Sequence, residues 1–78
     1  MTLEITAFIE DFELLLEEVD PGTILPGTIF RDIDEWSSLL ALMLIGMADE
    51  NYSVKLTGED IRTSTTVADL YAKITGKL

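Results

Sequence analysis

Apolar residues recur at steps of three and four along the N-terminal part of the chain. This spacing places them on one face of a helix and predicts a helix from about Leu3 to Glu18. Acidic residues lie mostly between the apolar ones, as on a helix whose outer face is in water. The expected core face consists of Ile5, Phe8, Phe12, Leu15 and Val19. The tripeptide Asp20-Pro21-Gly22 is expected to end this helix.

The segment from Pro21 to Glu35 shows no clear periodicity and contains a second Pro-Gly step at Pro26-Gly27. It is therefore expected to be a long loop. A loop of this length is unusual in a small domain unless its own side chains order it. We expect its apolar residues to enter the core: Ile24, Leu25, Ile29, Phe30 and Ile33.

An uncharged run then extends from Ser37 to Ala48. Because serine is a favoured N-cap, a second helix is predicted to start near Ser37 or Ser38 and to end near Asp49 to Asn51. Helical spacing suggests a core stripe of Leu39, Leu42 and Ile45, which directs Leu40, Met43 and Met47 toward solvent. Gly46 costs a helix about 1 kcal/mol relative to alanine, which suggests close packing or local bending there.

The remaining chain predicts an extended connector and two further helical segments. Tyr52 to Leu56 alternates like a strand but has no evident partner strand, so it is expected to be a connector. A short helical turn is expected from Glu59 to Arg62, and a last helix after Thr66, where Asp69 nearly completes a capping box. The buried stripe of that helix is expected to be Val67, Leu70, Tyr71 and Ile74. The chain is thus expected to form one all-α domain spanning residues 1–78.

The net charge of the chain limits the kinds of partner that it is expected to bind. Five basic and fifteen acidic residues leave a net charge of −10. Nucleic acid and anionic membranes are poor partners for such a chain, because both are bound by clustered Lys and Arg. Basic protein surfaces are the natural counterpart. Self-repulsion also predicts that added salt or mild acidification stabilises the fold.

The chain contains neither cysteine nor histidine. Disulfides and thiolate nucleophiles are therefore excluded, and so are the usual general base and the commonest metal ligand. The N-terminus lacks the pattern of a signal peptide, and the uncharged run is shorter than the roughly 20 residues that span a bilayer. We expect a soluble, cytoplasmic protein.

Ser38 is the leading candidate for chemistry. A hydroxyl at a helix N-terminus is a favourable place for a phosphate, because the N–H groups there lack intrahelical partners and the helix dipole favours negative charge. Taken alone, Ser38 is also consistent with an ordinary N-cap. Asp32, Asp34 and Glu35 lack the spacing of a calcium loop and are interpreted as solvated charge. Arg31 and Arg62 are interpreted as anchors of loops to acidic neighbours.

The tract Trp36-Ser37-Ser38-Leu39, followed by Tyr52-Ser53-Val54 and then Thr65-Thr66-Val67, resembles the acyl carrier protein family in order and spacing. Each motif is weakly specific by itself, but the resemblance covers nearly the whole chain. It implies a small antiparallel four-helix bundle with a short third helix and a long first loop. Trp36 is expected either to pack on the domain or to contact a transferase.

The resemblance further implies that Ser38 carries 4′-phosphopantetheine, attached from coenzyme A by a phosphopantetheinyl transferase. The terminal thiol of that group would hold acyl intermediates of fatty-acid or polyketide-like biosynthesis as thioesters. Implied partners are an acyl-loading enzyme and enzymes of the ketosynthase or acyltransferase type. The protein itself is expected to be a monomer and not an enzyme, since the chemistry is supplied by the group and by its partners.

Two departures from the family pattern bear on partner choice. Ser37 stands where the family usually has aspartate, so an N-cap is retained but a charge is missing. The second helix is apolar where carriers usually display acid, and acid returns only at Asp49 and Glu50. We therefore expect a more apolar partner interface. Its candidate residues are Trp36, Ser37, Leu39, Leu40, Met43, Met47, Asp49 and Glu50.

Other functions fit parts of the pattern. An aminoacyl or D-alanyl carrier shares the serine–helix arrangement. An unmodified interaction module would use the apolar face of the second helix and no prosthetic group. A serine hydrolase is disfavoured, because no histidine is present and the base would have to be Lys55, Lys73 or Lys77.

Overall fold

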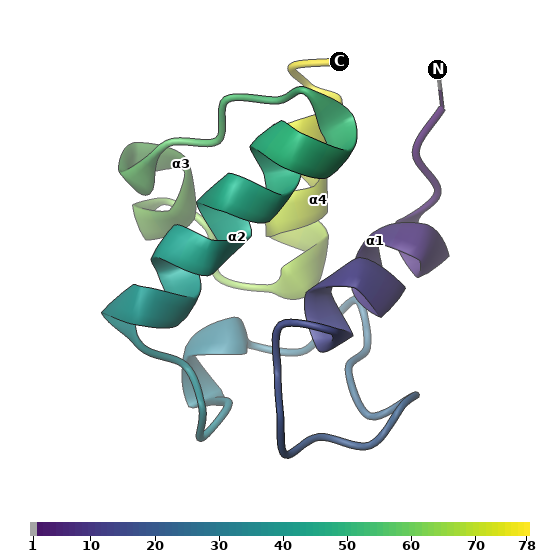
Figure 1. Ribbon diagram of the computed structural model, residues 1–78, viewed down its shortest axis with the longest axis vertical. Coiled ribbons are helices and arrows are strands. Elements are labelled where there is room, and N and C mark those ends of the chain that lie inside the picture. Colours follow the sequence, from purple (N-terminus) through teal and green to yellow (C-terminus); the bar gives the residue numbers. More distant parts are fainter. Residues whose placement is uncertain (1) are drawn as a thin grey trace.

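The computed structural model describes residues 2–78, and within them the regular structure is helical (Figure 1). No strand forms among these residues, and the only β-type pairing is one isolated bridge between Ile29 and Thr66. The prediction of an all-α fold is confirmed. The elements are α1 (Ile5–Glu13), a 3-10 turn η1 (Phe30–Asp32), α2 (Ser38–Tyr52), α3 (Gly58–Arg62) and α4 (Val67–Thr75).

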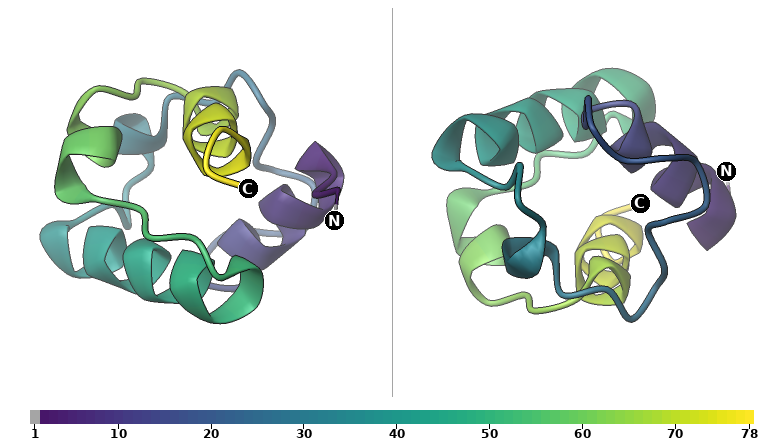
Figure 2. Two further views of the ribbon diagram at one scale, coloured as in Figure 1. Left: turned by 90° about the horizontal axis from the view of Figure 1, so that it is seen from above. Right: turned by 90° about the horizontal axis from the view of Figure 1, so that it is seen from below.

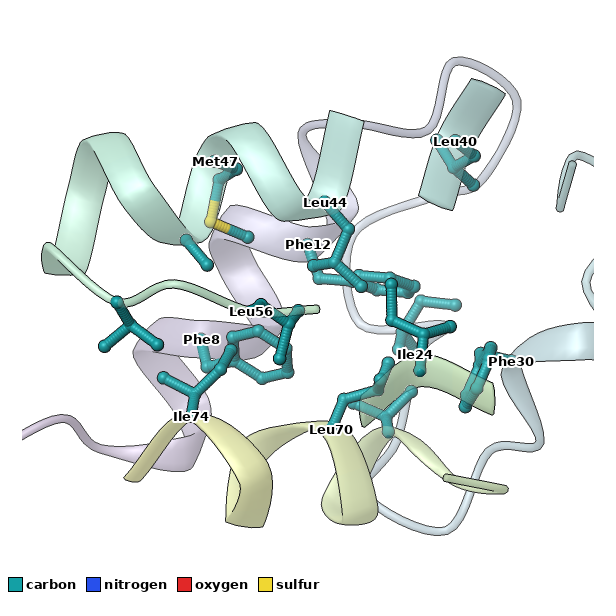
Figure 3. Close-up of a cluster of buried hydrophobic side chains, with 14 of the residues drawn as sticks. Phe8, Phe12, Ile24, Phe30, Leu40, Leu44, Met47, Leu56, Leu70 and Ile74 are labelled. Atoms are coloured by element: carbon teal, nitrogen blue, oxygen red, sulfur yellow. The ribbon is translucent and has the colours of Figure 1, made fainter. Parts of the chain in front are cut away.

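The helices surround one hydrophobic core, with α4 across from α2 and the long loop closing one end (Figure 2). Helix α1 packs against α4, while α3 contacts both α2 and α4. Figure 3 shows Leu44 and Met47 of α2 directed toward Phe12 of α1, and Ile74 of α4 directed toward Phe8. The largest completely buried apolar side chains are Phe8, Phe12, Phe30, Leu44, Val67, Leu70 and Ile74.

Helix α1 ends five residues earlier than the sequence pattern predicts. The Glu13 carboxylate accepts hydrogen bonds from the backbone N–H groups of Gly22 (3.0 Å) and Ile24 (3.3 Å), so it holds the returning loop. The chain leaves the helix in tight turns, and Leu14 is 83% exposed. Burial of Phe8 and Phe12 is confirmed, but Leu16, which was not predicted, is the next buried residue. Ile5, Leu15 and Val19 are only half-buried.

The long loop enters the core at two of the five expected residues, Ile24 and Phe30. Leu25 and Ile29 are exposed instead, and Ile33 is half-buried. Two loop carbonyls, those of Thr28 and Pro26, accept hydrogen bonds from Val67 N–H (2.9 Å) and Ala68 N–H (2.8 Å) at the start of α4. The loop is therefore fixed by backbone contacts as well as by buried side chains.

Both ends of α2 agree closely with the prediction. Ser37 is the N-cap, in extended conformation, and Ser53 closes the helix in the left-handed region with φ of 56°. The connector that follows is not a strand, as expected, and it buries Val54 and Leu56.

The predicted orientation of α2 about its own axis is wrong. Its buried face consists of Leu40, Leu44, Met47 and Ala48. Leu40 and Met47, expected in solvent, are 5% and 7% exposed, whereas Leu39 and Leu42, expected in the core, are 67% and 65% exposed. Ile45 is half-buried, and only Met43, at 41%, is exposed as expected. The error arises because apolar residues occupy both faces of this helix, so the pattern alone does not define which face is buried.

Two capping boxes start the C-terminal helices. The predicted pair of Thr66 and Asp69 is confirmed at α4, and Thr57 with Asp60 forms a second one at α3. Val67, Leu70 and Ile74 are buried as predicted. The fourth expected core residue, Tyr71, is half-buried, and its hydroxyl donates to the carbonyl oxygen of Leu3 at 2.5 Å.

Candidate functional site

Ser38 is the first residue of α2 and is exposed. The preceding Ser37 caps the helix: its Oγ accepts a hydrogen bond from the backbone N–H of Leu40 at 3.2 Å. Two adjacent serines thus have different environments. The Ser37 hydroxyl is engaged in the helix start, whereas the Ser38 side chain lies on the surface beside it.

The N-terminus of α2 has free capacity for an anion. Among residues 2–78, the backbone N–H groups of Ser38 and Leu39 donate to no protein acceptor. The first turn also contains no acidic residue that would neutralise the positive end of the helix dipole. Open N–H groups together with an uncompensated dipole are the features that favour a phosphate at a helix start.

The loop leading to Ser38 is fixed on one side by Arg31. Its guanidinium donates to three backbone carbonyls at the end of α3, those of Ser64 (2.6 Å), Ile61 (2.8 Å) and Arg62 (3.2 Å). It also lies 4.7 Å from the centre of the Phe30 ring. Trp36 packs edge-on against the same ring at 4.7 Å and is half-buried. The expectation that Trp36 packs on the domain is therefore confirmed.

Glu35 fixes the same loop on the other side. Its two carboxylate oxygens accept hydrogen bonds from the backbone N–H groups of Glu17 (2.7 Å) and Glu18 (2.8 Å). The segment that follows α1 is thereby held next to the start of α2. Glu35 has a structural role, so the interpretation of it as merely solvated charge is wrong.

The surface of α2 beyond Ser38 is apolar, as expected, and it includes Leu39 and Met43 of the expected interface together with Leu42, which was expected in the core. Leu39, Leu42 and Met43 are its exposed large side chains. Leu40 and Met47 belong to the core, so neither offers its side chain to a partner. At the far end of the helix, Asp49 forms an exposed ion pair with Lys55 at 3.0 Å, and Glu50 is exposed.

Ser38 has no evident base to activate its hydroxyl. The chain contains no histidine, and two of its three lysines are engaged elsewhere: Lys55 with Asp49, and Lys77 with Asp60 at 3.1 Å. The depression beside the helix start is lined by Leu15, Glu17, Glu35, Ser37, Leu39, Leu40 and Met43, which include no base stronger than a carboxylate. The geometry suits a serine that another enzyme modifies better than a nucleophile that acts alone.

Residues 2–78 contain neither an acidic cluster suited to a metal ion nor a helix suited to span a membrane. No group of three or more Asp and Glu side chains there is arranged to hold a metal ion, Asp32, Asp34 and Glu35 included. None of the helices in this part of the chain is both long and apolar enough to cross a membrane.

Arg31 and Glu35 are the residues whose roles were missed. Arg31 was expected to bind an acidic neighbour, but its partners are carbonyl oxygens, which carry no signal in the sequence. Arg62 does bind an acid as expected, pairing with Glu59 one helical turn earlier. The proximity of Glu35 to Glu17 and Glu18 also has no sequence signal, since it depends on where the loop returns.

Comparison with known proteins adds no relative: no protein-family profile, curated protein or solved structure matches this chain.

Proposed function

We propose that this protein is a carrier protein whose Ser38 accepts 4′-phosphopantetheine and presents thioester-linked acyl intermediates to biosynthetic enzymes. One observation carries the proposal. An exposed serine stands at the first position of a 15-residue helix whose first-turn N–H groups and dipole are available to a phosphate. The resemblance of the sequence to acyl carrier proteins supports the same residue.

The residues around Ser38 fit such a group. The phosphate would lie near the N–H groups of Ser38 and Leu39, and Leu39, Leu42 and Met43 offer apolar surface to the arm or to its cargo. When bound, the group supplies the thiol that forms thioesters with acyl chains. The chain's own contribution is to hold the serine on a braced loop at the surface.

The transfer needs a partner enzyme. The Ser38 oxygen forms a bond to the phosphorus nearest the pantetheine of coenzyme A, and the bond from that phosphorus to the bridging oxygen breaks. Adenosine 3′,5′-bisphosphate leaves, and the serine proton passes to a base of the transferase, since this chain has no histidine. The net charge of −10 favours a basic binding surface on that enzyme.

The rest of the proposal follows from the same resemblance. The four helices would form an antiparallel bundle of the carrier type, in a monomeric cytoplasmic protein without catalytic activity of its own. A loading enzyme and enzymes of the ketosynthase or acyltransferase type would be its further partners. Aminoacyl or D-alanyl cargo would use the same serine, because cargo is chosen by the loading enzyme.

Intact-protein mass spectrometry tests this function. The purified protein is incubated with coenzyme A and a broad-specificity phosphopantetheinyl transferase, next to Ser38→Ala and the neighbouring control Ser37→Ala. We expect one added phosphopantetheine on the wild type and on Ser37→Ala, and none on Ser38→Ala. A folded wild-type protein that gains no mass with several transferases would contradict the proposal.

The exposure of Leu39, Leu42 and Met43 favours a second candidate, an unmodified interaction module that binds partners through this face of α2. Ser38→Ala separates the two functions. A biosynthetic activity lost with the fold retained supports the carrier, whereas unchanged function supports the interaction module.

A further inference from the structure

The segment from Leu14 to Glu18 has a helical sequence pattern but not a helical structure. Leucine and glutamate are good helix formers, and Leu15 continues the apolar face of Phe8 and Phe12 at helical spacing. In the structure, α1 nevertheless ends at Glu13, and the chain that follows it is a coil (Figure 1). The local pattern thus favours a conformation that the fold does not show.

The backbone N–H groups after α1 leave the helical pattern in steps. The N–H of Leu14 bonds to the carbonyl oxygen of Glu10, four residues back, at 3.2 Å. The next two, those of Leu15 and Leu16, bond three residues back, each at 3.0 Å. Such bonds tighten the last turn of a helix, so the helix is already ending at these residues.

The Glu35 carboxylate binds the two N–H groups that follow. It accepts a hydrogen bond from Glu17 at 2.7 Å and another from Glu18 at 2.8 Å. In a continued helix these N–H groups would donate to the carbonyl oxygens of Glu13 and Leu14. One N–H group cannot make both bonds in full, so the contact with Glu35 and the extension of α1 exclude each other.

The surroundings of Glu35 do not reinforce this contact. Glu18, Asp32 and Asp34 line the same hollow as Glu35, and no lysine or arginine lines it. Carboxylates held close together repel one another. Within residues 2–78, the hydrogen-bond partners of the Glu35 side chain are the two N–H groups alone. The position of the segment after α1 therefore depends on these two bonds.

We propose that Glu35 is a latch on a segment with two alternative conformations. With the latch engaged, residues 14–18 form a turn that is tied to the loop before Ser38. With the latch released, α1 extends through these residues, Leu15 joins its core face, and the loop keeps the Arg31 brace but loses the Glu35 contact. The inference goes beyond the carrier function, and its test uses unmodified protein.

Glu35→Gln tests the latch, because its amide has the same shape, no charge and one acceptor oxygen for the two N–H groups. Asp34→Asn is the matched control: it removes the same charge from an exposed side chain that is bonded to neither N–H group. Backbone ¹³Cα shifts of both variants are compared with those of the wild type. We expect Glu35→Gln to move the shifts of residues 14–18 toward helical values and Asp34→Asn to leave them unchanged. Unchanged shifts in a folded Glu35→Gln protein, or equal changes in both variants, would overturn the proposal.

The same spectra report folding through the shifts of α4. If Glu35→Gln does not fold, Glu35→Asp takes its place, because its carboxylate is one methylene shorter and cannot reach both N–H groups. The same movement toward helical shifts is expected at residues 14–18, and its absence would overturn the proposal.

A second pair of variants distinguishes an extended helix from a loosened turn. In the Glu35→Gln background, Leu14→Ala keeps a good helix former, whereas Leu14→Gly disfavours continuation of the helix. Leu14 is 83% exposed, so neither substitution leaves a cavity in the core. We expect clearly smaller helical shifts at residues 15–18 with glycine than with alanine. Equal shifts would contradict the extension of α1.

Hydrogen exchange measures the effect on the loop before Ser38. The N–H of Trp36, the residue after Glu35, donates to the carbonyl oxygen of Ile33 at 2.9 Å. Its exchange should be about tenfold faster in Glu35→Gln than in Asp34→Asn, because the loop has lost one of its braces. Equal rates would overturn the link between the latch and this loop. None of these readouts involves phosphopantetheine transfer, so this proposal and the carrier function fail separately.

Discussion

The starts of α2 and α4 differ in how completely their backbone donors are used. At α4, the N–H groups of Val67 and Ala68 bond to loop carbonyls, and that of Asp69 bonds to the Thr66 side chain at 3.1 Å. At α2, only the Leu40 N–H has such a partner within residues 2–78, the Oγ of Ser37. We call the start of α4 closed, because its first N–H groups are hydrogen-bonded, and the start of α2 open, because the N–H groups of Ser38 and Leu39 are not bonded within residues 2–78.

The first turns of α4 and α2 also differ in their acidic residues. Asp69 stands in the first turn of α4, where it complements the dipole and accepts hydrogen bonds from the N–H groups of Thr65 and Thr66. The first turn of α2 has no acid, although the protein has fifteen acidic residues. A closed start stabilises the fold, whereas an open start leaves room for an external anion. This difference identifies the serine of α2, and not the threonine of α4, as the candidate for modification.

Ser38→Ala and Thr66→Ala should have opposite effects on phosphopantetheine transfer and on stability, and the loss of transfer is the largest effect that we expect. Ser38→Ala should abolish transfer of phosphopantetheine and change the free energy of unfolding by less than about 0.5 kcal/mol, because its side chain is exposed. Thr66→Ala should lower that free energy by about 1 kcal/mol and leave transfer intact, because it removes a cap. Urea denaturation and intact-mass analysis measure the two properties on each variant. A strongly destabilised Ser38→Ala variant would contradict the claim that the start of α2, unlike that of α4, contributes little to the stability of the fold.

Arg31→Ala should give the largest loss of stability among these variants. It removes charge-assisted hydrogen bonds to the end of α3 and the contact with Phe30, so we expect a loss of about 2 kcal/mol. Arg62→Ala is the matched control: among residues 2–78 the Arg62 side chain has one polar partner, Glu59, in an exposed ion pair worth less than about 1 kcal/mol, and the variant keeps the backbone carbonyl. Equal destabilisation by the two variants in urea would show that Arg31 does not brace the loop before Ser38.

The loss of stability at low pH should depend on the two carboxylates that cap α3 and α4, Asp60 and Asp69. Hydrogen bonds from the backbone N–H groups of Thr57 and Thr66 hold the pKa values of Asp60 and Asp69 below their ordinary value of 3.8. Carboxylates with a lowered folded pKa add stability above the unfolded pKa and lose it as pH falls through the folded one.

We therefore expect Tm to rise on mild acidification from neutral pH, as self-repulsion decreases, and to fall below about pH 3.8 as Asp60 and Asp69 are protonated. Thermal melts from pH 7 to pH 2 measure both limbs. Asp69→Asn should flatten the lower one. A Tm that falls steadily from neutral pH, or a lower limb that is unchanged in Asp69→Asn, would show that other groups dominate.

Ser37→Asp should change the free energy of unfolding by less than about 0.5 kcal/mol, since serine and aspartate are comparable N-caps. It restores the charge that carriers usually have at this position, so transfer to Ser38 should be faster. Initial rates with one transferase measure this, and Ser37→Asn is the uncharged control. Equal rates for both variants would mean that the transferase does not recognise this charge.

Local signals in the sequence were reliable where one residue type determines the outcome. The cap at Ser37, the box at Thr66 and the burial of Phe8 and Phe12 follow from short patterns, and the structure agrees with them. The exposed placement of Ser38 at a helix start was predictable for the same reason.

Tertiary contacts account for the errors. Glu13 ends α1 early by binding N–H groups of Gly22 and Ile24, which no local pattern indicates. The orientation of α2 depends on which of its two apolar faces packs toward the core. Leu39 and Leu40 are the same residue type, yet Leu39 is exposed and Leu40 is buried, so residue type alone does not predict this orientation. Thr57 and Asp60 have the capping-box spacing, and this box was a missed local signal.

The most direct test of the central claim is to locate the modification within the two-serine step. Wild-type protein is treated with coenzyme A and transferase, digested, and fragmented by tandem mass spectrometry to separate Ser37 from Ser38. The open helix start predicts phosphopantetheine on Ser38 alone, with Ser37 unmodified because its hydroxyl caps α2. Modification at Ser37, at a residue of α4, or at none in a folded sample would contradict it.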